Sequence, residues 1–206
     1  MVAMSARLWL VRHGATDWSD AGRLNGWTDV PLNERGRAQA TWLAGQLKGR
    51  EFAGVWSSDL ARAEETARLV LGQPVPDRRL RELDFGALEG RRWEEISAEV
   101  QRALITFDGF EAPEGESVAE LDSRVFRFLQ ELPRGEHLVV THGGVIRTLL
   151  RRSGNDLQPA PGELVRLNLN GRDPRRAGPN AMEPDTRRAR GAENSRGAQP
   201  TVPGLV

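Results

Sequence analysis

The sequence predicts an α/β protein: a three-layer α/β/α sandwich with a mostly parallel central sheet, a short helical cap and a disordered C-terminal tail. Three observations lead to this fold class. Short apolar runs alternate with helical patterns along the chain. Three of these runs are too continuous for a strand with one wet face, which indicates a sheet covered on both sides. The composition then changes near Gly171.

Four apolar runs are interpreted as strands, and they lie at residues 7–11 (RLWLV), 54–57 (GVWS), 137–141 (HLVVT) and 164–169 (LVRLNL). Between them, helices are predicted at residues 34–47, 60–71, 93–106 and 117–132, and another begins near Gly144. Asn33 and Asp59 are the expected caps of the first two helices. Ser117 begins the fourth helix, with Glu120 in capping-box spacing.

The bulk composition indicates one soluble domain, assigned to residues 1–170. The 206 residues carry 29 basic and 29 acidic side chains, so nothing global indicates a nucleic acid or a membrane surface as partner. No apolar stretch approaches the length that spans a bilayer. The N-terminus lacks the pattern of a signal peptide, and cysteine is absent. We therefore expect a cytoplasmic protein. The sequence is compatible with a monomer or a homodimer.

Residues 171–206 form a separate compositional segment, with five Gly, five Pro and seven Arg but no aromatic residue. Such a segment buries too little apolar surface to offset the entropy of ordering it. Its net charge of +3 leaves binding to an acidic partner open. A disordered extension is favoured, because the segment has no aromatic residues that could stack on bases.

Two of the predicted strands end in the same way. The first is followed by Arg12, His13 and Gly14, and the third by His142, Gly143 and a second glycine. Ligands of open α/β sheets bind outside the carboxyl ends of the strands, so the two histidines can face one another there. A glycine such as Gly14 lets the backbone approach a ligand closely.

Arginines accompany these histidines. Arg12 precedes His13, and Arg62 lies in the first turn of the helix that follows the second strand. Each feature alone fits an ordinary solvated strand end. Together they place four potential cations at one edge, which is costly unless an anion joins them. Phosphate is the simplest anion, because arginine binds it through two parallel hydrogen bonds and strand-to-helix junctions supply N–H donors.

A metal site is the natural competitor for paired histidines. The chain has only three histidines, no HExxH motif, and no acidic residue at ligand spacing from His13 or His142. Arginines beside the imidazoles would also repel a cation. We therefore expect no metal, and the sequence contains neither a GxxxxGK[ST] loop nor a GxGxxG after a strand.

Six blocks in order resemble the histidine phosphatase superfamily, also called phosphoglycerate-mutase-like, over about residues 7–169: VRHGATDW, NGWTDVPLNERGRAQA, SSDLARAEETA, RELDFGALEG, PEGES and VTHGG. The resemblance implies that His13 is the nucleophile and becomes phosphorylated. It implies that Arg12, Arg62 and His142 hold the phosphoryl group and that Glu82 protonates the leaving oxygen. Asn25, Gly26 and Gly143 would line the phosphate site, with no cofactor.

One position departs from the family pattern. Ser19 stands after Trp18, where the family commonly has asparagine. Serine is shorter than asparagine but can still donate a hydrogen bond. The departure therefore puts one phosphate contact in question, and it does not affect the expected chemistry.

The short segment between the block of Glu82 and PEGES resembles the caps of small phosphatases, including α-ribazole phosphatase and broad-specificity sugar-phosphate phosphatases. Cofactor-dependent phosphoglycerate mutases are longer here and carry a Glu-Arg-His-Tyr sequence, whereas this chain has no tyrosine. A phosphatase acting on a small phosphorylated molecule is therefore favoured. A mutase, and a non-catalytic phospho-ligand binding module on the same fold, remain alternatives. Apolar cap residues suggest an apolar substrate wall or simply core: Trp93, Ile96, Leu104, Phe107 and Phe110.

Overall fold

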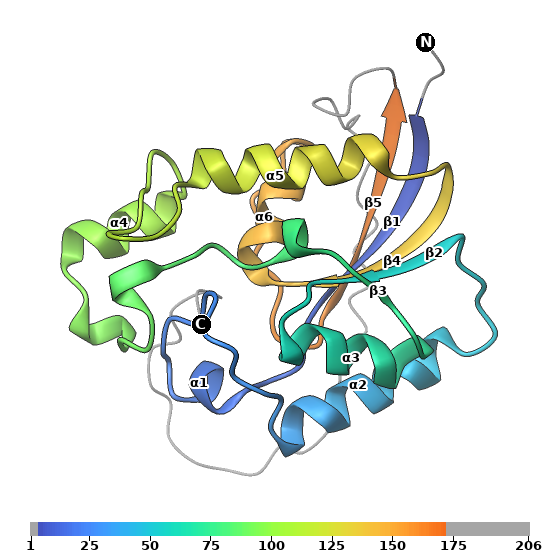
Figure 1. Cartoon of the computed structure of the whole chain (residues 1–206), viewed down its shortest axis with the longest axis horizontal. Helices are drawn as coiled ribbons and strands as arrows, with labels where there is room; N and C mark the ends of the chain where they lie inside the picture. Colours follow the sequence, from blue (N-terminus) through green and yellow to red (C-terminus); the bar gives the residue numbers. More distant parts are fainter. Residues whose placement is uncertain (1–3, 172–206) are drawn as a thin grey trace.

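The described residues, 4–171, form a five-stranded sheet between two layers of helices in this computed structural model (Figure 1). The strands lie in the order β3-β2-β4-β1-β5, and all neighbouring pairs are parallel except β1 and β5. The predicted α/β fold with a mostly parallel sheet is confirmed. The strands are β1 (Met4–Arg12), β2 (Gly54–Ser57), β3 (Val75–Pro76), β4 (Gly135–Thr141) and β5 (Leu164–Gly171).

The side chains of β1 alternate between two hydrophobic cores. Leu8 and Leu10 belong to the core on one face of the sheet, and Trp9 and Val11 belong to the core on the other. All four are at most 5% exposed. Burial on both faces explains why the first strand is a continuous apolar run rather than an alternating one.

Helices α2 (Glu34–Leu47) and α3 (Ala61–Leu71) cover the face that carries Trp9 (Figure 1). The side chain of Asn33 caps α2 as predicted and accepts a hydrogen bond from the N–H of Gly36 at 2.9 Å. The backbone at the end of α3 turns at Gly72, whose φ of 88° few other residues adopt.

The prediction that Asp59 caps α3 is wrong. The N-cap residue is Leu60, and the carboxylate of Asp59 instead binds the guanidinium of Arg81 through two contacts of 2.7 Å. The backbone N–H of Ala61, the first residue of α3, donates instead to the carboxylate of Asp29 at 2.8 Å. The cap is thus supplied by a loop that is distant in sequence.

Helices α5 (Val118–Glu131) and α6 (Gly143–Arg151) cover the opposite face. Ser117 caps α5, and Glu120 accepts a hydrogen bond from the backbone N–H of Ser117 at 2.8 Å, so the predicted capping box is present. α6 begins directly after β4, which places its amino-terminal N–H groups at the carboxyl edge of the sheet.

The cap is made of short helices. It contains the 3-10 turns η2 (Gly86–Leu88) and η3 (Trp93–Glu95) and the helix α4 (Ala98–Thr106). The helix predicted over residues 93–106 is therefore broken, because Ile96 and Ser97 have extended backbones. The side chain of Ser97 accepts from the N–H of Val100 and begins a new helix there. The cap at Ser97 therefore sets where the helix begins, although the apolar pattern continues on both sides of it.

The remaining elements are short, and sequence periodicity did not predict them: α1 (Asp17–Asp20), β3 and the 3-10 turn η1 (Arg78–Leu80). β5 extends one residue into the segment predicted as tail. The rest of that segment, 172–206, lies outside the described residues. Within residues 4–171, no helix combines the length and the apolar character that crossing a membrane requires.

Candidate active site

The two strand-end histidines meet at the carboxyl edge of the sheet. β1 and β4 are adjacent and parallel, and Arg12 lies opposite Thr141 in their register. The next residue in each strand is a histidine, and the N–H of His13 donates to the carbonyl of Thr141 at 2.9 Å. The ring centroids of His13 and His142 are 5.0 Å apart. The strand register therefore fixes how far apart the two imidazoles lie.

The two ring nitrogens of His13 have different partners: Nδ1 faces the carbonyl of Gly14, and Nε2 accepts a hydrogen bond from Nε of Arg62. Its Nδ1 lies 2.7 Å from the carbonyl oxygen of Gly14, which can only accept a hydrogen bond. The proton of the neutral ring is therefore assigned to Nδ1, and Nε2 keeps its lone pair. Burial, aided by the charges of Arg62 and Arg12, lowers the pKa of His13 well below its usual 6.5. The imidazole is neutral at neutral pH.

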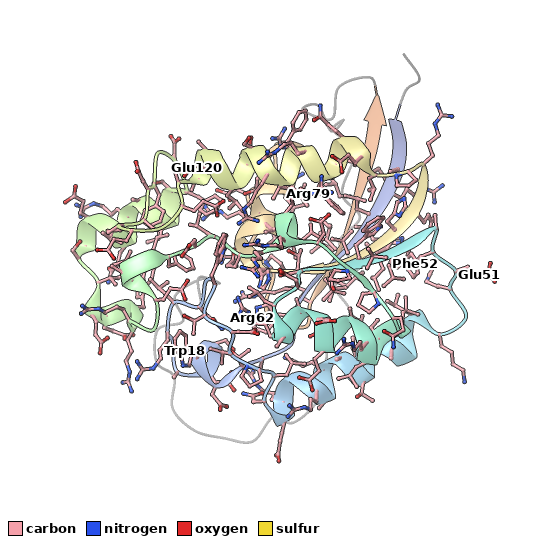
Figure 2. The ribbon with its side chains drawn as sticks, viewed as in Figure 1. Trp18, Glu51, Phe52, Arg62, Arg79 and Glu120 are labelled. Atoms are coloured by element: carbon pink, nitrogen blue, oxygen red, sulfur yellow. The ribbon has the colours of Figure 1, made fainter. Side chains whose placement is uncertain are left out.

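Arg62 is fully buried beside this nucleophilic nitrogen. Its Nε lies 3.3 Å from Nε2 of His13. Its two Nη atoms donate to backbone carbonyls in the loop between α1 and α2, including that of Gly26 at 2.6 Å. Burial lowers the pKa of Arg62 to about 10, so the guanidinium still carries its charge at neutral pH. Figure 2 shows Arg62 at the start of α3, in the middle of the molecule.

Arg12 and His142 complete the basic group. Arg12 donates from Nη1 to the carbonyl of Pro159 at 2.9 Å. His142 is fully buried, and neither of its ring nitrogens has a hydrogen-bond partner among the described residues. Burial, then the charges of Arg62 and His13, lower the pKa of His142 well below its usual value. Two charged guanidiniums beside two neutral imidazoles form an environment that favours an anion.

Glu82 lines the same cavity as Arg12 and His13. Its side chain accepts hydrogen bonds from the N–H of Leu83 at 2.9 Å and from the N–H of Gly144, which is 3.1 Å from both carboxylate oxygens. A Cβ on Gly144 would lie 2.4 Å from one of those oxygens. Glycine at this position therefore lets the carboxylate reach the first turn of α6.

Asn25 and Gly26 have different positions in the site. The side-chain oxygen and nitrogen of Asn25 are buried without a partner among the described residues, and Asn25 lines the cavity described below. Buried polar groups are almost always satisfied, so this amide is suited to a ligand. Gly26 supports Arg62 through its carbonyl, and a Cβ there would collide with Leu83 and Glu89.

Ser19 faces the cavity, but its hydroxyl is occupied. It donates to the carbonyl of Thr16 at 2.9 Å and accepts from the N–H of Thr16 at 2.9 Å, which completes the capping box of α1. The hydroxyl must leave this box in order to donate to a phosphate.

The glycines beside the histidines serve different contacts. A Cβ on Gly143 would lie 3.1 Å from the amide nitrogen of Gln158 and 3.5 Å from the guanidinium of Arg12, so Gly143 leaves room for both side chains. A Cβ on Gly14 would lie 2.4 Å from the carbonyl oxygen of Gly36. Glycine is therefore required at position 14 by the close packing of this loop on α2.

A cavity with about 550 Å³ of empty space, including its open mouth, is lined by Arg12, His13, Ser19, Asn25 and Glu82. The other predicted site residues are not among those that line it: Gly26, Arg62, His142 and Gly143. The cap side is apolar, and Phe107 is placed there by a left-handed backbone with a φ of 53°. The apolar residues that line this side are Leu83, Phe85, Leu104 and Phe107. Of the five apolar cap residues named from the sequence, only Leu104 and Phe107 line this cavity.

Three further polar residues line the cavity and carry no signal in a single sequence: Arg23, Arg147 and Gln158. Arg147 is bound to the carboxylate of Asp156 and to the carbonyls of Leu104 and Ile105. These partners come from different segments, so only the fold brings them together. Among the described residues, no group of three or more His, Cys, Asp or Glu side chains could hold a metal ion.

The fold and the site are those of a phosphoryl-transfer domain. Similarity to known proteins shows which family it belongs to. The sequence model of the histidine phosphatase superfamily (branch 1) matches residues 8–169. The chain belongs to this superfamily, whose members are mutases and phosphatases that use a phosphohistidine.

Individual relatives carry different names. A Yersinia pestis (strain Pestoides F) protein named "Probable phosphoglycerate mutase GpmB" is 36% identical over 156 residues, covering 70% of this chain and 73% of the relative. The structure of phosphoglycerate mutase from Thermus thermophilus is 45% identical, with a TM-score of 0.74, covering 80% of this chain and 97% of the other. An Escherichia coli K-12 candidate alpha-ribazole-5'-P phosphatase is 33% identical, with a TM-score of 0.70, covering 82% and 92%.

Proposed function

We propose that this protein is a metal-independent phosphomonoester hydrolase that acts through a phosphohistidine on His13, with Glu82 as the proton donor. The observation that carries the proposal is the environment of His13 Nε2. It is the unprotonated nitrogen of a buried neutral imidazole, 3.3 Å from the charged Arg62, in a residue that lines the same cavity as the carboxyl group of Glu82. His13, Arg12 and Glu82 line one cavity, and Arg62 contacts His13 directly.

In the first step, Nε2 of His13 attacks phosphorus as the bond from phosphorus to the ester oxygen breaks. Glu82, in its protonated form, gives its proton to the departing oxygen. Arg12, Arg62 and His142 are placed to stabilise the charge on the equatorial oxygens, and the unpartnered amide of Asn25 can donate to one of them.

In the second step, water attacks the phosphohistidine. Glu82, now a carboxylate, takes a proton from that water, and the nitrogen–phosphorus bond breaks to release inorganic phosphate. Positioned donors and charges supply the stabilisation in both steps, so no metal is needed to neutralise the phosphoryl group.

A hydrolase is favoured over a mutase by the cap side of the cavity. A mutase that rephosphorylates a phosphoglycerate must bind a carboxylate as well as the reacting phosphate. The apolar residues that line the cavity are Leu83, Phe85, Leu104 and Phe107. Of its two further arginines, Arg147 is bound to Asp156 and to the carbonyl of Leu104, and Arg23 donates to the carbonyl of Gly90. An organic phosphate with a partly apolar leaving group suits this wall.

The mutase remains the second candidate, because the Yersinia and Thermus relatives carry mutase names. An interconversion assay with 2- and 3-phosphoglycerate, with and without the bisphosphate, separates the two. Rapid, bisphosphate-stimulated interconversion would contradict the preference for hydrolysis.

The central test is His13→Ala on p-nitrophenyl phosphate, in the presence of a chelator. We expect the wild type to hydrolyse it and the variant to lose activity by at least about 10³-fold, the scale on which catalysis fails without its nucleophile. Rapid quenching of wild type with radiolabelled substrate in an alkaline denaturant should trap a label on the peptide that contains His13, and acid should remove that label. His137 is the internal control, because its Nε2 contacts the carbonyl of Pro133 away from the cavity. Activity in His13→Ala, or activity abolished by the chelator, would overturn the proposal.

A further inference from the structure

One arginine holds the backbone around Glu82. The segment from Arg81 to Phe85 has no helix or strand of its own, although it follows η1. The guanidinium of Arg124, on α5, donates to the carbonyl of Arg79 at 2.8 Å, to that of Arg81 at 2.6 Å and to that of Glu82 at 2.7 Å. One carbonyl of η1 and two of the irregular segment thus converge on one side chain.

The remaining donors of Arg124 bind Glu116, in the loop that leads into α5. Arg124 Nε lies 2.6 Å from one carboxylate oxygen of Glu116, and Nη2 lies 2.8 Å from the other. The N–H of Glu116 donates to the carbonyl of Asp84 at 2.9 Å. The pair is nearly buried, with side chains 10% and 12% exposed. All five N–H donors of the guanidinium are used, which a lysine with three donors cannot reproduce.

A second side chain contacts the same carbonyl. Trp27 donates from Nε1 to the carbonyl of Glu82 at 2.8 Å. The carbonyl of Glu82 therefore accepts two side-chain hydrogen bonds, while its carboxylate accepts from Leu83 and Gly144. Backbone and carboxylate of one residue are fixed from α5, from the loop before α2 and from α6. Figure 1 shows α5 running over η1 and the start of this segment.

We propose that Arg124, held by Glu116, is the positioning residue for the proton donor Glu82, and that Trp27 assists it. Arg124 is not among the residues that line the cavity, and it binds the backbone of Glu82 directly. Its charge also helps to lower the pKa of His142, and Arg124→Lys keeps that charge. The inference rests on the proposed function, in which Glu82 protonates the leaving oxygen.

The proposal has a signature that ordinary destabilisation lacks. A proton donor must lie within hydrogen-bond reach of the leaving oxygen, and a displacement of about 1 Å can cost about 10²-fold in rate. This loss of rate appears only with substrates whose leaving group must be protonated as it departs. Nitrophenolate departs without one near neutral pH, whereas the alkoxide of β-glycerol phosphate does not. Misplacing Glu82 should therefore slow the alkyl ester much more than the aryl ester.

The experiment compares kcat/KM for β-glycerol phosphate and p-nitrophenyl phosphate in the full chain. The variants are Arg124→Lys, which keeps the charge but loses the planar fork, and Trp27→Phe, which removes one donor from the Glu82 carbonyl. We expect Arg124→Lys to lose about tenfold to 10²-fold more on the alkyl ester than on the aryl ester. Trp27→Phe should show the same selectivity to a smaller degree. If Arg124→Lys does not fold, the result with Trp27→Phe tests the positioning role.

The matched control is Arg152→Lys. Arg152 also pairs with an acidic residue of α5, Asp122, through two contacts of 2.6 Å, but it binds no atom of residues 79–84. It should lower the rates on both esters equally or not at all.

Glu82→Gln separates the two proposals. If Glu82→Gln slows the alkyl ester selectively while Arg124→Lys and Trp27→Phe slow both esters equally, the positioning role is overturned and the proposed function stands. If Glu82→Gln itself shows no selectivity, Glu82 is not the proton donor and both proposals fall.

Discussion

Two neutral histidines are buried among charged arginines, and this links the site to the stability of the fold. The pKa values of His13 and His142 lie well below 6.5 in the folded protein, mainly because of burial. In the unfolded chain both return to about 6.5. Below that pH the unfolded state binds more protons than the folded state, so acid favours unfolding.

We therefore expect the free energy of unfolding to be fully present above about pH 6.5 and to fall as the pH drops below it. Each histidine contributes a slope of up to about 1.4 kcal/mol per pH unit. Urea titrations at pH 7.5 and pH 5.5 measure the difference, and His142→Gln should make it smaller. The comparison uses the pH dependence, so any constant effect of the substitution cancels. Equal pH dependence in wild type and variant would contradict this assignment.

Ser19 provides a second prediction for a single residue. Its hydroxyl is engaged with Thr16, whereas the longer amide of Ser19→Asn can extend into the cavity. We expect inorganic phosphate to inhibit this variant roughly fivefold more tightly, since one net hydrogen bond is worth about 1 kcal/mol. The measurement is the inhibition constant in the aryl phosphate assay.

Ser19→Ala is the companion variant. It should weaken the cap of α1 by about 0.5–1 kcal/mol without a change in the inhibition constant of phosphate. Weaker inhibition would mean that the serine hydroxyl already binds phosphate in the wild type.

At the scale of the element, the first turn of α6 provides a sharper test. Gly144→Ala places a methyl group 2.4 Å from the carboxylate of Glu82, which has to move away. We expect a loss of at least about tenfold in kcat/KM on alkyl phosphates, as for other displacements of a catalytic group. Gly143→Ala should be milder, because its nearest neighbour, the amide of Gln158, is flexible.

A glycine on another helix serves as the control for this pair. A Cβ on Gly45, in α2, would meet no atom within 4 Å. Gly45→Ala should leave the rate unchanged and stabilise the protein by about 0.5–1 kcal/mol, the usual gain in a helix interior. If Gly144→Ala were as harmless as Gly45→Ala, the contact between Glu82 and α6 would not matter for catalysis.

The elements also show which structure is readable from sequence. The caps at Asn33 and Ser117 depend on residues within one turn, so local patterns predict them. The cap of α3 cannot be read in this way, because its carboxylate comes from Asp29 and leaves Asp59 to bind Arg81. Local caps also explain the break of the predicted helix at Ser97.

The same division holds for the site. His13 and His142 follow two buried strands, and parallel strands end at one edge, so their meeting follows from pattern and topology. Gln158, Arg23 and Arg124 reach the site or its support through loops and helix positions that depend on tertiary packing. No spacing in the sequence marks them.

At the scale of the whole molecule, the five strands and the cavity-lining residues that the structure describes all lie within residues 4–171. β5 pairs with β1 as far as Gly171, and the cavity is lined by residues no later than Gln158. We propose that the functional domain ends there. A chain truncated after Gly171 should keep its kcat/KM, and its free energy of unfolding should change by less than about 1 kcal/mol, the size of a typical point mutation. Loss of activity on truncation would assign residues 172–206 a part in the domain.

The backbone bond from His13 to Thr141 has a consequence for the lifetime of the site. It continues the ladder between β1 and β4, which are interior strands of the sheet, so the amide proton of His13 should exchange with solvent only when the entire domain unfolds. The amides of the cap, between Gly86 and Ser117, belong to short elements and should exchange through local openings. The nucleophile thus lies in a part of the fold that opens only on global unfolding, whereas the substrate wall lies in a part that opens locally. Substitutions in the cap can alter which esters enter while the amide of His13 keeps the slowest exchange in the molecule.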